Sequence, residues 1–591
     1  MSNRQSAPPA ALPAAARGRD ALADPAVCGV HLSDLPGGGG PSGRSASRLP
    51  WVLLLALLLA GAAAWVWRFD PELSFYGDDD ANYLILGKAI SLGRGYRMIT
   101  DPLEPLNTNY PPGYPLLIAG AAAAMGQPSL RDLLWGVKFL GLALWAGAVC
   151  SFFGLERRRE GLLVAAAATA LFALHPEILR MAGEAMSEVP FLCFSLLGLW
   201  AFDRLLPPPE TGRGAGSARV VLVAAALTWP VYIRTIGVAL PLAAVLLLAW
   251  RRRLRQAVLL GAACALLFVP FALQSRSVAG ATIRGTHLQD LLTKERPFAA
   301  TSSAELYTEG GPEGSSRTNV GEVLGRVRVA FWYYRRALPT VAVYTGSTDV
   351  MDLPLAVSFL GLALLLAGCW ARLRAGLTLS EVYVALYMGV LCLWPFRYER
   401  LLVPILPFLI LYGVKGVEVW SAAAARLAPR AARRPMVASA IVLASAFTLA
   451  VGYPRQAAEA AEAALPLEAR PWTPRWIVGY MDATVWIARS AAPEAVVFCL
   501  RPRHMSVVTG HKAGTYLVAS PAELVRRIRS HRRSYVVEDE SSFAKRYLRP
   551  ALDVLERSGE VRLVHAGAAR GATRVWLVPG DPGGRRGGGA G

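Results

Sequence analysis

The sequence predicts a polytopic α-helical membrane protein with about eleven transmembrane helices and a small C-terminal α/β domain on the outer face. Two observations carry the membrane prediction. Of the 591 residues, 54% are hydrophobic and only 18% are charged, whereas a soluble protein needs a charged exterior. The apolar residues also run in nearly uncharged blocks of roughly 13 to 21 residues, and the longer blocks have the length that crosses about 30 Å of hydrocarbon.

The apolar blocks expected to cross the membrane follow one another along most of the chain. In order they are 51–67, 133–153, 162–174, 188–206, 220–232, 236–250, 257–273, 353–370, 382–396, 401–414 and 437–451. A further apolar piece, 116–125, is too short to span comfortably and is interpreted as an interfacial or re-entrant helix.

The distribution of basic residues predicts the topology. The formal net charge is +20, but the arginines gather at alternate ends of the apolar blocks, for example at 157–159, 251–255 and 426–434. This is the positive-inside pattern of membrane proteins, so it disfavours a nucleic-acid partner. We expect a multi-pass protein of a bacterial-type inner membrane whose N-terminus is cytoplasmic. The seven cysteines show no disulfide or metal-binding spacing.

The domain boundaries follow from changes in composition. Residues 1–48 are rich in Ala, Pro and Gly and predict a disordered cytoplasmic tail. The transmembrane domain is expected over 49–453, with outer loops at 69–130, 175–187 and 274–352. Residues 454–580 predict a periplasmic α/β domain, and 581–591 a second disordered tail. Strands are expected at 495–500, 506–509, 534–538 and 574–578, and helices at 474–492, 521–531 and 543–558.

Two polar constellations stand out in the first outer loop. Three carboxylates, Asp78, Asp79 and Asp80, are followed by Asn82 and Tyr83. Adjacent carboxylates repel one another near a membrane, so they suggest catalysis, a cation or a basic substrate; the alternative is an acidic helix start favoured by the helix dipole. Residues 109–115 contain Tyr110 and predict a Pro-rich turn. The alternative is that these prolines only interrupt the helical structure and have no role in a site.

Other candidates lie at the ends of later apolar blocks. Glu188 opens one block, after an outer segment that contains His175 and Glu177; capping or solvation are the structural alternatives. Arg234 separates two blocks, and Arg397 and Arg400 separate two others. An ionisable residue between membrane spans usually indicates a functional site. The alternative is that an arginine near the membrane interface only extends its charged end into the headgroup region (snorkelling).

The order of these motifs resembles the GT-C glycosyltransferases that use polyprenyl-phosphate sugars, in the branch of the protein O-mannosyltransferases and the aminoarabinose transferases. The resemblance covers about residues 50–420; the C-terminal domain is similar to the outer domains of many bacterial members. It implies that Asp79 is the catalytic acid of the family's acidic pair, that Asp80 is the second, and that Tyr83 completes the motif.

The resemblance also implies where the donor phosphate binds. Glu188 corresponds to the acid that organises the phosphate or a metal, and Arg234 and Arg397 would lie near the phosphate, with Arg400 as a further candidate. One departure concerns the residue before Pro-Pro, which is lysine in aminoarabinose-type relatives and Tyr110 here. Tyr110 is retained as a donor-side candidate, but the change weakens assignment to that subgroup.

The function implied is transfer of a sugar, with inversion, from a polyprenyl-phosphate donor to a lipid, glycan or protein acceptor on the outer face. Asp79 would act as the base. A divalent cation at Asp80 and Glu188 is compatible with the pattern, but no spacing demands a metal or another cofactor. The rival readings are a transporter or lipid flippase, and a non-catalytic receptor or scaffold. The acids lie in an outer loop rather than at mid-membrane, and paired interrupted repeats are not visible, which disfavours the transporter.

Overall fold

The structure is a computed structural model, and it describes residues 48–73, 79–107, 110–206, 217–279, 320–343, 355–394, 399–466, 469–470, 473, 475–518, 520–567 and 573–580. These residues all belong to one compact unit, Ser47–Gly591. The predicted tails at 1–48, except Arg48, and at 581–591 lie outside the described residues, as do Asp78 and Arg397.

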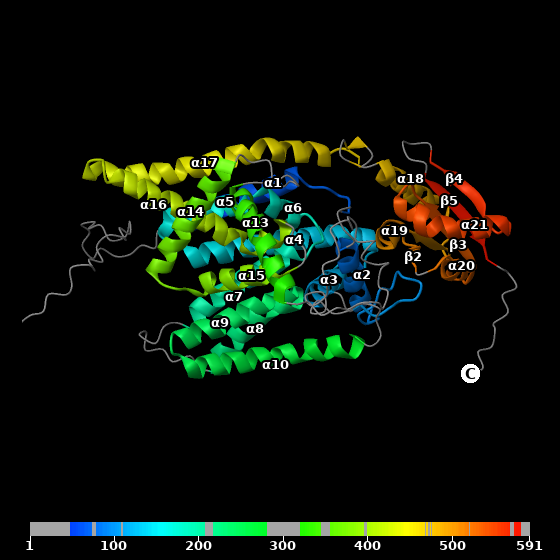
Figure 1. Ribbon diagram of the computed structural model, residues 1–591, viewed down its shortest axis with the longest axis horizontal. Coiled ribbons are helices and arrows are strands. Elements are labelled where there is room, and N and C mark those ends of the chain that lie inside the picture. Colours follow the sequence, from blue (N-terminus) through cyan, green and yellow to red (C-terminus); the bar gives the residue numbers. More distant parts are fainter. Residues whose placement is uncertain are drawn as a thin grey trace, which may run out of the picture. The chain divides into compact units, whose positions relative to one another are not determined.

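Helices occupy the described parts of the apolar blocks in the transmembrane domain, apart from a few residues at their ends (Figure 1). The helices at these blocks are α1 (Leu49–Trp67), α4 (Leu130–Glu156), α5 (Gly161–Ala173), α7 (Glu188–Leu205), α8 (Ser217–Ile233), α9 (Ala239–Trp250), α10 (Leu254–Ala279), α14 (Leu355–Ala375), α15 (Leu379–Leu393), α16 (Leu406–Ala425) and α17 (Arg430–Ala463). Short 3-10 helices, η3 (Thr235–Val238) and η4 (Glu399–Ile405), precede α9 and α16. The prediction of a multi-pass helical protein is confirmed.

The structure confirms where the apolar helices lie, but it does not fix how many of them cross the membrane. Among the described residues, five helices are long and apolar enough to cross a membrane, or six if α5 and α6 (Pro176–Ala182), which meet at a bend of 56°, count as one broken span. Several others, such as α8 and α9, are shorter apolar helices. The count of about eleven spans therefore stays a prediction.

The longest helix that was not predicted lies in a segment expected to be an outer loop. Helix α13 (Val320–Val343) falls in the segment 274–352, which the sequence suggested only as a long polar outer loop. Its arginines interrupt every apolar run, so the segment does not resemble a span. The helix packs against α14, α15 and α16, and Ala330 and Ala337 are fully buried. Leu324, Phe331 and Trp332 are exposed whereas Arg326 is buried, so the helix is attached to the bundle with large apolar side chains on its outer side.

Short helices build the region between the first spans. Helices α2 (Asp79–Ser91) and α3 (Gly113–Ala124) pack closely, because a side chain at Gly87 would lie 2.4 Å from Cγ2 of Ile118. Helix α3 is too short to span, as predicted. At its start, a side chain at Gly113 would lie 2.6 Å from the carbonyl oxygen of Tyr232. This close approach brings the Pro-rich turn against the end of α8.

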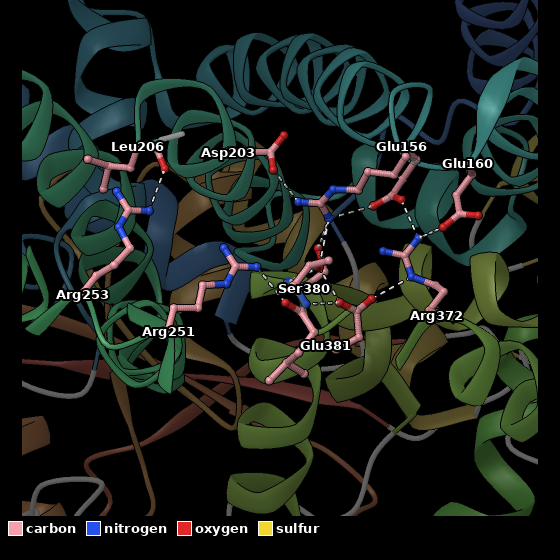
Figure 2. Close-up of polar contacts among 12 residues, drawn as sticks. Glu156, Glu160, Asp203, Leu206, Arg251, Arg253, Arg372, Ser380 and Glu381 are labelled. Atoms are coloured by element: carbon pink, nitrogen blue, oxygen red, sulfur yellow. Dashed lines mark hydrogen bonds and ion pairs between the residues drawn. The ribbon is translucent and has the colours of Figure 1, made fainter. Parts of the chain in front are cut away.

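The basic loops of the bundle meet at one end (Figure 2). The Arg372 guanidinium on α14 contacts Glu156 at 2.8 Å, Glu160 at 2.6 Å and Glu381 at 2.7 Å, so it joins the α4–α5 loop to α15. Further contacts join neighbouring loops: Arg159 to Asp203 at 2.8 Å, Arg251 to the Leu377 carbonyl at 2.8 Å, and Arg253 to the Leu206 carbonyl at 3.4 Å. The prediction that these arginine clusters share one side agrees with these contacts.

The C-terminal domain contains a mixed five-stranded sheet in the order β2-β1-β3-β5-β4. Its elements are α18 (Arg475–Ser490), β1 (Val496–Cys499), α19 (Pro502–Thr509), β2 (Lys512–Thr515), α20 (Pro521–Arg529), β3 (Arg533–Glu538), the π-helical turn η6 (Ala544–Leu548), α21 (Arg549–Arg557), β4 (Arg562–Ala566) and β5 (Arg574–Pro579). Strand β1 is parallel to β2 and β3, whereas β5 is antiparallel to β3 and β4.

The sheet has an apolar cluster on each face. Val497 and Cys499 lie in one cluster, and Val496 and Phe498 in the other, because successive side chains of a strand alternate between faces. The predicted α/β domain is confirmed, with one wrong strand: 506–509 forms the end of helix α19. Strands β2 and β4 were missed, because β2 contains Lys512 and Gly514 and most of β4 is exposed at the sheet edge.

Candidate functional site

The predicted polar residues converge at the start of helix α7, whereas the basic network of Figure 2 involves its last turn. Asp79 begins α2, Glu188 begins α7, Arg234 lies between α8 and η3, and Arg400 lies in η4. Since α7 has 18 residues, about 27 Å of helix separates the two groups of charges at ~1.5 Å per residue.

Asp79 lies between a phenol and a guanidinium group. The Tyr110 hydroxyl donates to Asp79 Oδ1 at 2.7 Å, and Arg400 Nη2 lies 3.3 Å from Oδ2. The Tyr110 hydroxyl in turn accepts a hydrogen bond from Asn82 Nδ2 at 3.2 Å. The Asp79 side chain remains 30% exposed, so its carboxylate is oriented by its neighbours and still accessible. Tyr110 therefore contacts the predicted catalytic acid.

Glu188 and Arg234 form a pair beside this carboxylate. Arg234 Nη1 lies 2.6 Å from Glu188 Oε1, and the Glu188 side chain is only 1% exposed. Glu188 stands in the first turn of α7, where the helix dipole favours a negative charge. A charge at this depth requires a partner, so Arg234 is more than a snorkelling side chain.

The break between α8 and η3 places Arg234 in the site. Helix α8 ends at Ile233, and Arg234 adopts an extended backbone, with φ −146° and ψ 133°. A side chain at Gly237 would lie 2.7 Å from the Pro230 carbonyl carbon, so the chain folds back tightly after the break. The turn therefore depends on a glycine at this position.

Ser187 connects the two groups, although the sequence analysis did not select it. Its hydroxyl accepts a hydrogen bond from the Tyr83 hydroxyl at 3.1 Å and contacts Arg234 Nη1 at 3.2 Å. Burial, together with the nearby Asp79 carboxylate, raises the pKa of Tyr83, so this phenol remains a donor at neutral pH. The signal was present as the Ser-Glu pair at the start of a span.

Asp80 has different neighbours from Asp79. It is 1% exposed, and its Oδ1 accepts the Ala81 N–H at 2.7 Å. The same oxygen lies 3.6 Å from Nε2 of His504, in the C-terminal domain. The adjacent acids are thus separated into one accessible carboxylate and one buried carboxylate. His504 had no sequence signal, because its contact spans more than 400 positions.

The metal prediction concerned Asp80 and Glu188. Over the part of the chain that the structure describes, no group of three or more His, Cys, Asp or Glu side chains is arranged to hold a metal ion. Glu188 pairs with Arg234 and Asp80 faces His504. Arg397, the remaining donor-side candidate, lies outside the described residues.

Comparisons with known proteins identify the fold. No protein-family model and no curated protein matches the chain. Among solved structures, ArnT from Cupriavidus metallidurans bound to undecaprenyl phosphate matches with a TM-score of 0.56 and 13% identity, over 90% of this chain and 98% of ArnT. The chain has the GT-C fold.

Two further structures support this assignment of the GT-C fold. ArnT in the apo state matches with a TM-score of 0.54 and 13% identity, over 90% of this chain and 98% of that chain. The Archaeoglobus fulgidus oligosaccharyltransferase tethered with an acceptor peptide matches with a TM-score of 0.52 and 15% identity, over 87% of this chain and 72% of that chain. At these identities the likeness concerns the fold, and the resemblance noted in the sequence is confirmed at that level.

Proposed function

We propose that the chain is a membrane glycosyltransferase that moves a sugar from a polyprenyl-phosphate donor to an acceptor hydroxyl, on a lipid, glycan or protein, at the outer face. The observation that carries this proposal is the accessible Asp79 carboxylate, held by Tyr110 and Arg400 beside the Arg234–Glu188 pair. The likeness to ArnT, whose structure contains undecaprenyl phosphate, supports the donor class.

The chemistry requires a base and a cationic environment. The acceptor oxygen forms a bond to the anomeric carbon while the bond from that carbon to the phosphate oxygen breaks. The acceptor proton passes to the Asp79 carboxylate, a contribution of roughly 10²- to 10⁴-fold in rate. The departing polyprenyl phosphate keeps the bonding electrons. Direct displacement of this kind inverts the anomeric centre.

Asp79 is better suited than Asp80 to the role of base. Its carboxylate is 30% exposed, whereas Asp80 is 1% exposed and bonded to its neighbouring backbone. A base must come within hydrogen-bond reach of the proton that it removes. An acceptor hydroxyl can approach Asp79 without rearrangement of the helix start.

Arg234 and Arg400 are the proposed contacts of the leaving phosphate. Their side chains are 20% and 32% exposed, so each guanidinium group retains surface for a ligand. Arginine presents a planar set of donors that matches phosphate and keeps its charge at all relevant pH values. The two groups would stabilise the negative charge that develops on the phosphate.

Transport is the competing function, and the location of the charges argues against it. Asp79 and Glu188 lie at the starts of α2 and α7, whereas transporters bind substrates near mid-membrane.

The test is donor consumption by the purified protein in liposomes. A panel of radiolabelled polyprenyl-phosphate sugars is supplied on both sides of the bilayer, together with lipid and glycan acceptors, and cleavage of the sugar–phosphate bond is followed. We expect cleavage of one donor class by the wild type and almost none by Asp79→Asn. A folded wild type that cleaves no donor but moves labelled lipid across the bilayer would contradict the proposal.

A further inference from the structure

The C-terminal α/β domain contributes a side chain to the acidic pair. His504 Nε2 of α19 lies 3.6 Å from Asp80 Oδ1 of α2. Both residues are 1% exposed, so the contact lies in the interior of the unit and not on a surface. It joins the residue next to the proposed base with a domain that begins about 400 positions later.

Helix α19 is packed from both sides, which fixes the position of His504. Met505 is fully buried and belongs to the apolar cluster of the α/β domain. Val507, two residues later, is 3% exposed and belongs to the apolar cluster of the transmembrane domain. The helix also contacts α2 and α4 directly. His504 therefore stands on an element with little freedom to move relative to α2.

A second contact holds the same domain against the loop that follows α2. The Ala513 N–H of strand β2 donates to the Thr100 carbonyl at 2.9 Å. Beside it, Lys512 Nζ lies 2.7 Å from Glu104 Oε1, and this ion pair lowers the pKa of Glu104. The α/β domain thus contacts the chain both at the start of α2 and beyond its end.

We propose that His504 is a positioning residue of the transfer site: it fixes the Asp80 carboxylate and, through it, the first turn of α2 that presents Asp79. This proposal rests on the proposed function. Asp79 and Asp80 are adjacent on one helical turn, so a shift of Asp80 also moves the proposed base. A misplacement of about 1 Å can reduce the rate of an enzyme about a hundredfold.

The test compares His504→Ala with the wild type in the liposome transfer assay. We expect kcat to fall about tenfold to a hundredfold, while KM for the polyprenyl-phosphate sugar changes little, because the proposed phosphate contacts are on other elements. His504→Gln places an amide nitrogen near the position of Nε2 and should recover part of the rate. His511→Ala is the matched control: His511 is a buried histidine of the same domain whose Nε2 contacts the Ala492 carbonyl at 3.1 Å, and its loss should leave kcat unchanged.

A double variant separates positioning from general stability. If His504 acts through Asp80, His504→Ala should add almost nothing to the defect of Asp80→Asn, since coupled residues are non-additive. Additive defects, an unchanged kcat in His504→Ala, or equal losses in His504→Ala and His511→Ala would each overturn the proposal while leaving the glycosyltransferase function standing. A wild type that cleaves no donor would instead overturn the function and, with it, this role.

Discussion

At the residue scale, the charged side chains of the site are paired with one another, and two guanidinium groups remain partly exposed to solvent. Arg234 is paired with Glu188 at 2.6 Å, and Arg400 lies 3.3 Å from Asp79. Buried charges persist only when they are paired, because desolvation costs several kcal/mol per ion. Under the proposed function, a phosphate that entered this site would meet cations already held in place, so its binding would require little reorganisation.

The first residue-scale prediction concerns Asp79. Asp79→Asn preserves the shape of the side chain and can still contact Tyr110, but it removes the base. We expect kcat to fall by at least about a hundredfold, while binding of the polyprenyl-phosphate donor is retained. Single-turnover transfer and equilibrium donor binding, measured on the same preparation, separate these two effects.

The neighbouring acids supply the controls for Asp79. Asp78→Asn should be tolerated far better, because Asp78 is one position outside the acidic pair that the family resemblance selects. Asp80→Asn should have an intermediate effect, because Asp80 acts on the position of α2 rather than on the proton. Equal and mild effects of all three substitutions would mean that the acidic run is only a solvated helix start.

The second residue-scale prediction concerns Arg234. Arg234→Ala leaves Glu188 buried without its partner, so it should abolish transfer and also lower the thermal stability. Arg234→Lys retains the positive charge but lacks the planar set of N–H donors, so it should keep a small part of the activity. The double variant Arg234→Gln/Glu188→Gln should recover much of the stability and none of the transfer. If transfer survives in Arg234→Ala, the arginine is only structural.

Part of this site could be predicted from the sequence. The sequence shows four charged residues next to apolar blocks, namely Asp79, Glu188, Arg234 and Arg400. A charge next to a membrane span is energetically unfavourable, so its presence there indicates a function. Their joint location could not be derived, because it depends on how helices far apart in sequence pack. Ser187 is an ordinary helix-start residue by sequence, and the contact of His504 with Asp80 crosses a domain boundary.

At the element scale, irregular helices position the site. Arg234 lies at the break between α8 and η3, and Arg400 in η4 just before α16. The sequence predicted two apolar blocks on either side of Arg234 but not the 3-10 turn that directs its side chain. Helix α13 was missed because its arginines interrupt its apolar runs, and 506–509 was misread as a strand because β-branched residues also occur in a buried helix.

The element-scale prediction concerns the buried network around Arg372. Arg372 is 4% exposed and is shared by Glu156, Glu160 and Glu381. Arg372→Met would leave three buried carboxylates without this cation, and breaking a buried pair costs about 3–5 kcal/mol. We expect a marked fall in the unfolding temperature of the detergent-solubilised protein, and reduced donor cleavage only in proportion to the folded fraction.

The control for Arg372 is two residues away on the same helix. Arg374 is exposed, and its guanidinium carbon lies 4.8 Å from the centroid of the Trp370 ring. An exposed cation–π contact contributes about 0.5–1 kcal/mol, so Arg374→Met should change the unfolding temperature only slightly. Comparable losses for both variants would show that the network does not hold α4, α14 and α15 together.

At the scale of the whole molecule, the two charged groups have different tasks at the two ends of the bundle. The network around Arg372 joins loops through its ion pairs with Glu156, Glu160 and Glu381. The site around Asp79 has partly exposed charges, and it adjoins the α/β domain through His504. The positive-inside rule predicts that the basic loops are cytoplasmic, and we therefore propose that the Asp79 site and the α/β domain lie on the outer face.

This assignment makes a prediction about labelling from the two sides of the membrane. In a cysteine-free background, Leu427→Cys lies between α16 and α17, at a position that is 94% exposed. Lys545→Cys lies at an exposed position of the α/β domain. A membrane-impermeant thiol reagent added to intact cells should label Lys545→Cys at once and Leu427→Cys only after permeabilisation, because a single span, in α17, lies between the two positions. Labelling of both positions from outside would put α16–α17 and the α/β domain on one side. The outer placement of the donor site would then lose its physical basis, even if every contact around Asp79 were correct.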